Sequence, residues 1–173
     1  RHADILGISL VLRSRVGRGS VFSFQVPLLD RPAALAAMQI TDEEIEELAQ
    51  RVEDIALENQ TEGGTEEADR EFHLAIARAT RNTAVFQTIE DLWKLRRTSP
   101  ESALLHAKAR TANIKPVVAE HGAVIDAIRQ RNPAAARSAM RAHLAAVLDS
   151  LLFATEGNDS DDARRLRYAG APG

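Results

Sequence analysis

Hydrophobic residues recur every three or four positions over most of this 173-residue chain, the spacing of helices that bury one face. This pattern predicts helices from 41 to a break at 61–64, from 65 to about 82, and over 83–97, 109–131 and 133–154. The segment 98–100, which contains a proline, is expected to end one helix, and Pro116 predicts a kink or a late start in the next. We therefore expect an all-α fold, an antiparallel bundle of five or six helices.

Residues that favour helix starts support these boundaries. Thr41 and Glu44 have the spacing of a capping box, in which each side chain bonds the other residue's backbone amide. Thr65 is placed to cap the following helix. Asn132 followed by Pro133 is typical of a cap with proline at the first helical position, so the last helix is expected to begin there.

The first 30 residues have a different pattern. Apolar residues alternate with neighbours over 8–12 and again over 21–26, on either side of a glycine-containing turn at 15–19. Such alternation predicts a short N-terminal β-hairpin. We therefore divide the chain into a hairpin at 1–30, a helical domain at 31–155 and a flexible polar tail at 156–173.

The composition narrows the possible functions. Without cysteine, the chain has no disulfides, thiolate metal sites or cysteine nucleophiles. A net charge of −3 argues against nucleic-acid binding by this chain alone, because such modules usually have a basic face. No apolar run approaches the roughly 20 residues that span a bilayer, and the N-terminus lacks a signal-peptide layout. We expect a cytoplasmic protein with no membrane partner.

An aspartate and three histidines fall on the apolar stripes of three predicted helices. Asp69 and His73 lie four positions apart and so share one helix face, while His121 and His143 lie on two other helices. One interpretation is that these are satisfied polar residues of the core. The other is a shared metal ion, because each buried imidazole needs polar partners. An Asp/His₃ set suits Zn²⁺ or Ni²⁺, with Mn²⁺ and Fe²⁺ as alternatives.

Three segments with these residues resemble a known family. They are the Asp69-x₃-His73 helix that ends in Ala-Thr-Arg-Asn82, the Glu120-His121 pair, and the alanine-rich segment 132–144. Over about residues 33–155 the chain is similar to the C-terminal effector-binding (FCD) domain of FadR-type GntR transcription regulators. The resemblance implies an all-helical bundle in which Asp69, His73, His121 and His143 hold a divalent metal, with a small organic acid bound against it.

Two shorter segments indicate the chemical class of the effector. Residues 89–106 and 158–170 look like the hexuronate-utilisation, UxuR/ExuR-like branch of these regulators, so we expect a hexuronate-like acid. Arg96 and Asn82 are candidate ligand-binding residues, since a guanidinium offers a bidentate fork to a carboxylate. An alternative interpretation makes Arg96 a solvated surface residue. The resemblance also implies a homodimer.

The chain departs from the family pattern at its beginning. The winged helix-turn-helix of the family, and much of the first effector-domain helix, are expected to be missing. Residues 1–29 instead resemble the closing hairpin of a histidine-kinase ATPase domain, without the boxes that bind nucleotide. This arrangement suggests a truncated gene fusion or an artefact of sequence assembly. Binding to DNA would then need the absent winged helix-turn-helix.

Two other functions remain to be weighed against sensing. A helical-bundle metalloenzyme, such as a hydrolase, would use metal-bound water and a general base. Glu120 is the nearby candidate, but neighbouring residues on a helix point about 100° apart, so we expect it to face away from His121 and the chain not to be an enzyme. A non-functional truncated fragment is the third reading.

Overall fold

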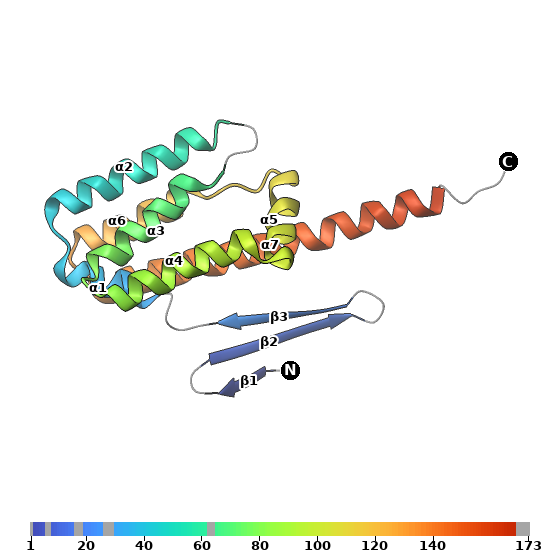
Figure 1. Ribbon diagram of the computed structural model, residues 1–173, viewed down its shortest axis with the longest axis horizontal. Coiled ribbons are helices and arrows are strands. Elements are labelled where there is room, and N and C mark those ends of the chain that lie inside the picture. The colour runs from blue at the N-terminus through green and yellow to red at the C-terminus, as the bar shows by residue number, and fades with distance from the viewer. Residues whose placement is uncertain (1, 6–7, 16–18, 26–29, 62–64, 169–173) are drawn as a thin grey trace.

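The structure is a computed structural model that describes the backbone of residues 2–5, 8–15, 19–25, 30–61 and 65–168, and the side chains of 30–61 and 65–151. Three antiparallel strands come first, β1 (His2–Ile5), β2 (Ile8–Arg15) and β3 (Gly19–Gln25), in the order β1-β2-β3 (Figure 1). Leu12 in β2 lies opposite Phe22 in β3. Positions 16–18, in the turn predicted between these two segments, lie outside the described residues.

Helices make up the rest of the described chain and form one bundle (Figure 1). Where five or six were expected, there are seven. Their bounds are α1 (Arg31–Gln39), α2 (Asp42–Glu58), α3 (Glu67–Ala79), α4 (Thr83–Thr98), α5 (Pro100–Thr111), α6 (Val118–Arg129) and α7 (Pro133–Tyr168). The expected all-helical bundle is therefore confirmed, and it begins with the nine residues of α1.

Two of the three predicted helix starts are confirmed. Thr41 and Glu44 form the reciprocal capping box of α2, and the Asn132 side chain accepts a hydrogen bond from the Ala135 amide at the start of α7. The prediction that Thr65 caps α3 was wrong. The Glu58 carboxylate, at the end of α2, accepts hydrogen bonds from the first amides of α3 and from the Thr65 hydroxyl, so a neighbouring helix supplies the cap.

The segment around Pro100 starts a helix as well as ending one. The Ser99 hydroxyl accepts a hydrogen bond from the Ser102 amide, and Pro100 occupies the first turn of α5. Proline is favoured there because its missing N–H has no partner to lose. The sequence pattern predicts only the end of a helix at these residues, so α5 was not predicted. Beyond α5, Pro116 precedes the late start of α6 at Val118, which was one of the two outcomes predicted.

The last helix is longer than predicted. We expected it to end near residue 154 and the tail at 156–173 to be flexible, but the backbone of α7 is helical as far as Tyr168. Between residue 154 and Tyr168 the chain has one glycine, Gly157, and no proline. A single glycine costs a helix only about 1 kcal/mol, which does not end it. Polarity alone was therefore a poor sign of a loop.

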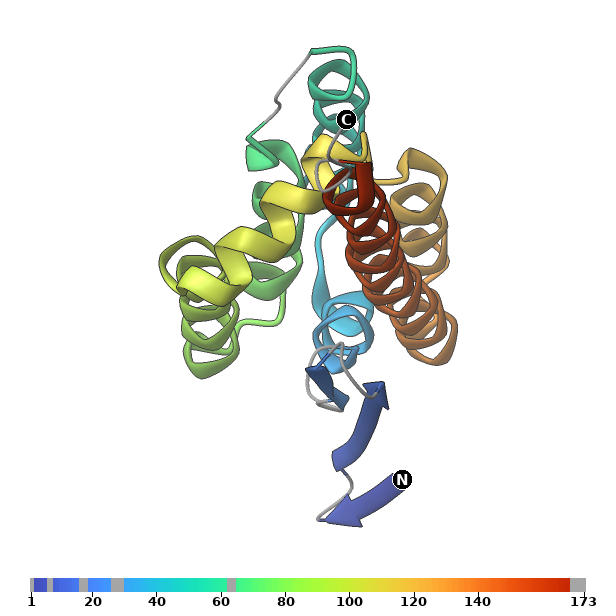
Figure 2. The ribbon, with the colours of Figure 1, turned by 90° about the vertical axis from the view of Figure 1, so that its right-hand side faces the viewer.

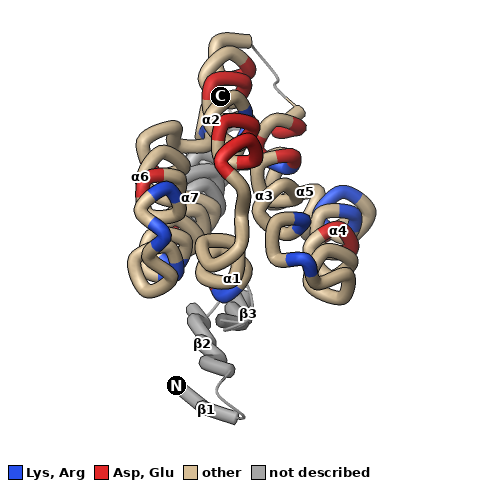
Figure 3. Tube along the Cα trace, turned by 90° about the vertical axis from the view of Figure 1, so that its left-hand side faces the viewer, with Lys and Arg blue, Asp and Glu red and all other residues tan. Residues whose placement is uncertain are grey.

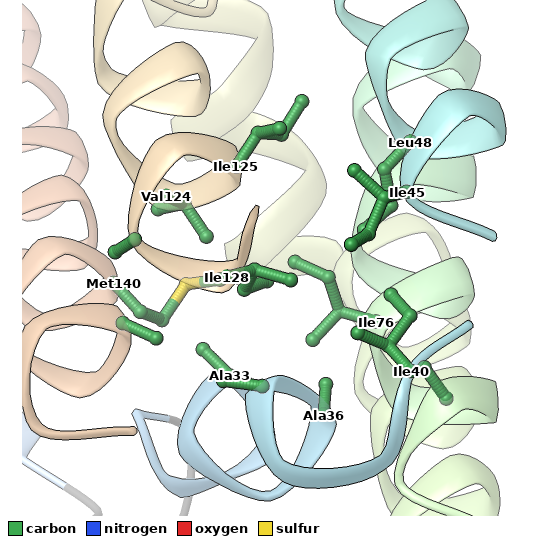
Figure 4. Close-up of a cluster of buried hydrophobic side chains, with 14 of the residues drawn as sticks. Ala33, Ala36, Ile40, Ile45, Leu48, Ile76, Val124, Ile125, Ile128 and Met140 are labelled. Atoms are coloured by element: carbon green, nitrogen blue, oxygen red, sulfur yellow. The ribbon is translucent and has the colours of Figure 1, made fainter. Parts of the chain in front are cut away.

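The hydrophobic core lies where α1, α2, α3, α6 and α7 meet (Figure 2). Phe72 on α3 is fully buried in it. Ile128 on α6 and Met140 on α7 are almost fully buried beside the alanines of α1 (Figure 4). The small side chains Ala33, Ala36 and Ala37 let α1 approach α3 and α7 closely. This packing fixes α3, α6 and α7 relative to one another, and these three helices carry the candidate metal ligands.

Charge is distributed unevenly over the bundle. α2 carries eight acidic residues and one arginine, whereas α4 has Lys94, Arg96 and Arg97 in its last turns. Figure 3 shows the acidic turns of α2 and the basic turns of α4 on separate parts of the surface. Among the described residues, no helix is both long enough and apolar enough to cross a membrane.

Candidate metal centre

The four residues predicted as metal ligands come together in the structure. Asp69 and His73 project from the first turns of α3, and His121 and His143 reach them from α6 and α7. One ligand atom from each residue lies within 4.8 Å of the other three. Asp69, His121 and His143 are 7%, 0% and 2% exposed, so the cluster is inside the bundle and not on its surface.

The distances between ligand atoms suit a small metal ion. The Nε2 atoms of His73 and His143 are 3.4 Å apart, and His73 Nε2 is 3.5 Å from Asp69 Oδ1. Two ligands of a tetrahedral ion lie about 3.3–3.5 Å apart when each bond is about 2.0–2.1 Å long. His121 Nε2 is closer, at 2.8 Å from the same carboxylate oxygen, and would separate from it to admit an ion.

The other nitrogen of two of these rings is bonded in a way that prepares Nε2 for a metal. His121 Nδ1 donates to the carbonyl oxygen of Val117 at 2.8 Å, and His143 Nδ1 donates to the Glu120 carboxylate at 2.9 Å. Because a carbonyl and a carboxylate accept but do not donate, each Nδ1 carries the proton. The lone pair of a neutral ring is then on Nε2, which faces the centre. Metal-binding histidines generally have such partners.

Electrostatics within the cluster keep the carboxylate ionised. Burial opposes charge on Asp69, but hydrogen bonds and charge from His121 and His73 outweigh it and hold the Asp69 pKa far below its usual range. Burial likewise opposes protonation of His121, yet its contact with Asp69 raises its pKa. For His143, burial and the charges of the other two imidazoles lower the pKa to about 4. Both shifts place the proton between Asp69 and His121 on the imidazole and not on the carboxylate.

Two hollows flank the cluster. One, with about 510 Å³ of empty space, lies between α3, α5, α6 and α7 and is lined by Asp69, Glu120 and His143 together with apolar residues such as Val147. The other, with about 620 Å³, opens between α3, α4 and α7, with Trp93, Leu92 and Ile89 along one wall. Arg96 lines both. A small molecule could therefore reach the ligand atoms from either side of α3's first turns.

Arg96 lies at the site, in agreement with its selection as a candidate ligand contact. Its Nη1 is 3.9 Å from Asp69 Oδ2, its guanidinium carbon is 4.3 Å from the centre of the Trp93 ring, and it forms an ion pair with Glu66. It is 20% exposed, so it is not simply a solvated surface residue. Its position places a fixed positive charge beside the carboxylate that faces the metal position.

Asn82 is not brought to the site. Its side-chain oxygen accepts hydrogen bonds from the Ala84 and Val85 amides, which makes it the N-cap of α4. It follows the C-terminal end of α3, whereas Asp69 is in the first turn of that helix. Asn82 is also not among the residues that line the two hollows. Its position therefore explains an asparagine at the end of this motif through capping.

Three further residues at the site were not selected from the sequence. Glu120 was expected to face away from His121, but its carboxylate bonds His143 on α7 and lines the first hollow together with Asp69. Its carboxylate is therefore a support for a ligand and not a free general base. His106, on α5, lines the first hollow, and burial with the charges of nearby arginines lowers its pKa to about 4. Glu66 pairs with Arg96, and burial raises its pKa despite that charge.

Comparison with known proteins assigns the family. The family model of the FCD domain matches residues 28–146, more than half of the chain. The Uxu operon transcriptional regulator of Escherichia coli (strain K12) is 32% identical over 123 residues, covering 69% of this chain and 48% of that protein. The Exu regulon transcriptional regulator of the same strain is 28% identical over 144 residues, covering 81% of this chain and 54% of that protein. The chain thus spans about half the length of these two regulators.

A solved structure supports the same fold. Streptococcus agalactiae GntR matches with a TM-score of 0.51 and 24% identity, over 79% of this chain and 73% of that one. The relatives are named as transcriptional regulators, so the chain is grouped with regulators and not with the metalloenzymes considered above. The chain belongs to the FCD domain family, the effector-binding part of GntR-type transcription regulators.

Proposed function

We propose that this chain is a metal-dependent sensor of a small organic acid within a GntR/FadR-type regulator. The observation that carries the proposal is the convergence within 4.8 Å of four ligand atoms, three of them from buried residues, supplied by three helices of the bundle. The hydrogen bonds of His121 and His143 to acceptors behind them support it, because they leave the Nε2 lone pairs facing the centre.

The donor set indicates which ion and which effector would bind. One carboxylate and three imidazoles suit Zn²⁺ or Ni²⁺, held by Asp69, His73, His121 and His143. When bound, such an ion would offer open coordination positions to a carboxylate or hydroxyl oxygen of the effector. Arg96, 3.9 Å from Asp69, would hold a further anionic group. Together with the likeness of residues 89–106 to the UxuR/ExuR-like branch, this favours a hexuronate-like acid.

The intact regulator would act as a cytoplasmic homodimer that binds DNA through a winged helix-turn-helix. Within the described chain, an ion pair links the centre to the start of the bundle. Asp30, just before α1, is 2.7 Å from Arg141, which lies two residues before His143 on α7. A small shift of α7 on effector binding would therefore move the first residues of the helical domain. Such a link between ligand and helix position is what a sensor requires.

Metal content and thermal stability test the proposal. Purified wild-type protein should hold about one equivalent of Zn²⁺ or Ni²⁺. A metal concentration of 100 times Kd stabilises by about 2.7 kcal/mol, or roughly 5–10 °C for a chain of this size. His121→Ala should lose both the metal and the increase in melting temperature. His106→Ala removes an imidazole that lines the hollow but is outside the cluster, and should keep both.

The effector is then tested with the metal-loaded protein. D-glucuronate, D-galacturonate, L-lactate and citrate are added in turn, and we expect a hexuronate to raise the melting temperature of wild type but not of His121→Ala. Wild-type protein that binds no divalent metal, or a His121→Ala variant that binds it equally well, would contradict the metal-dependent sensor.

A further inference from the structure

Glu66 adopts a backbone conformation that glutamate rarely has. Its φ of 59° and ψ of 27° lie in the left-handed region, immediately before α3. This conformation is unfavourable for a residue other than glycine, because the Cβ atom comes too close to the following carbonyl oxygen. The side chain does not offset the cost by capping α3, because Glu58 binds the first amides of that helix. Some other interaction of Glu66 therefore stabilises this arrangement.

That interaction is an ion pair with Arg96. Both side chains are largely withdrawn from water, with 14% of Glu66 and 20% of Arg96 exposed. Burial also raises the pKa of Glu66, which means that its carboxylate has lost hydration that the arginine only partly replaces. The two charged groups are in direct contact, but the ion pair requires the carboxylate to lose hydration and the backbone of Glu66 to adopt an unfavourable conformation. An external anion that took the place of Glu66 would let its carboxylate return to water.

The ion pair between Glu66 and Arg96 lies at the wall of the first of the two hollows that flank the metal cluster, the one between α3, α5, α6 and α7. Glu66 and Arg96 both line this hollow, as do Asp69 and His143. Both also line a third cavity, distinct from the two hollows described above. It lies between α3, α4 and α5, and Arg70 and Arg110 contribute to its lining. The Glu66 carboxylate therefore occupies the position on the guanidinium that an acid group of a molecule in the hollow would take.

We propose that Glu66 is an internal competitor of the effector, occupying the anion subsite on Arg96 until a carboxylate of the organic acid displaces it. The inference rests on the proposed sensing function and adds to it a second contact point. Because Arg96 Nη1 is only 3.9 Å from Asp69 Oδ2, the two contact points are adjacent. They fit a short hydroxy acid or sugar acid that binds the metal with one oxygen group and Arg96 with its carboxylate.

Two variants remove the competing carboxylate in different ways. Glu66→Gln keeps the size of the side chain and loses its charge. Glu66→Gly removes the side chain and suits the left-handed backbone, so it is expected to fold even where the first variant is unstable. The matched control is Glu67→Gln, which changes the same charge one residue later, in a side chain that is 48% exposed and pairs with Arg70 and Arg97.

Binding is measured by calorimetry on the full Zn²⁺-loaded chain, with D-glucuronate, D-galacturonate, L-lactate and citrate as probes. Both Glu66 variants should bind the best probe about tenfold more tightly than wild type, while Glu67→Gln should match wild type. Arg96→Gln should bind it at least tenfold more weakly. A probe bound by the Glu66 variants but too weakly by wild type to measure also supports the proposal.

The fluorescence of the single tryptophan provides a second readout beside the binding affinity. The guanidinium of Arg96 lies 4.3 Å from the Trp93 ring centre, so its release should change the emission. In the Zn²⁺-loaded proteins without acid, the emission of Glu66→Gln should differ from that of wild type in the same direction as wild type with bound acid.

The outcomes separate this proposal from the sensor itself. If wild type binds metal and acid but the Glu66 variants have unchanged affinity and emission, the internal competitor is refuted and the sensor stands. If no protein binds any of the four acids, the proposal and the acid-sensing function both fail. If metal is absent as well, the metal centre fails with them.

Discussion

Replacement of Glu120 tests whether the centre depends on the groups behind its ligands. Its carboxylate accepts the Nδ1–H of His143 at 2.9 Å, which holds the ring in the tautomer whose Nε2 faces the other ligands. Loss of such a partner typically weakens metal binding by about 10–100-fold. Because Glu120 is 29% exposed, water can partly replace it. We therefore expect the lower end of this range for Glu120→Gln, about tenfold or about 1.4 kcal/mol.

The assay is a competition titration of Zn²⁺ between the protein and a chromophoric chelator, at one pH and ionic strength. Asp126→Asn is the matched control, because it removes a carboxylate from the same helix at a position that is 70% exposed and pairs with Arg129. It should bind Zn²⁺ as wild type does. The amide oxygen of the glutamine in Glu120→Gln can still accept this hydrogen bond, so the variant tests the negative charge of the partner. If Glu120→Gln also keeps wild-type affinity, the charge behind His143 does not strengthen metal binding, and the reasoning is refuted.

Two further predictions concern pH and Asn82. Lowering the pH from 8 to 6 should weaken Zn²⁺ binding, because the ion must displace the proton that Asp69 stabilises on His121. Below the raised pKa of His121 the affinity should fall by up to about tenfold per pH unit. A Zn²⁺ affinity that does not change over a series of titrations at different pH values would contradict this. Asn82→Ala should lower the free energy of unfolding in urea by about 1 kcal/mol through loss of the α4 cap, with unchanged metal and acid binding. A loss of acid affinity in that variant would instead restore Asn82 as a ligand contact.

Much of the bundle could be predicted because helical periodicity is a local property of the chain. The stripe of α2 and the caps at Thr41 and Asn132 depend on residues a few positions apart, and the structure has them as predicted. The failures came where one residue type supports two interpretations. Ser99 and Pro100 both end α4 and begin α5, and the polar stretch after residue 154 carries no strong helix breaker.

The convergence of the four ligands could be predicted for a related reason. Asp69 and His73 are one turn apart on α3, and their inward direction follows from the apolar residues beside them. His121 and His143 follow the same rule on α6 and α7, and helices that bury one face direct those faces to a common centre. Helical spacing thus directs all three rings inward, and the resemblance to the family indicated that they meet at one centre.

The positions of the supporting residues Glu120 and Glu66 do not follow from helical spacing. Glu120 contacts a neighbouring helix, and Glu66 lies outside the helix that carries Asp69. Glu120 is one position from His121, and helical spacing alone does not predict that α7 brings the Nδ1 of His143 to it. Glu66 is outside α3 altogether, and its direction follows from a left-handed φ that glutamate seldom adopts. The ligands of such a site can be read from helical spacing, whereas the groups that tune it depend on which neighbour fills each side of a helix. The Glu66 and Glu120 variants therefore test the part of the site that only the three-dimensional structure could supply.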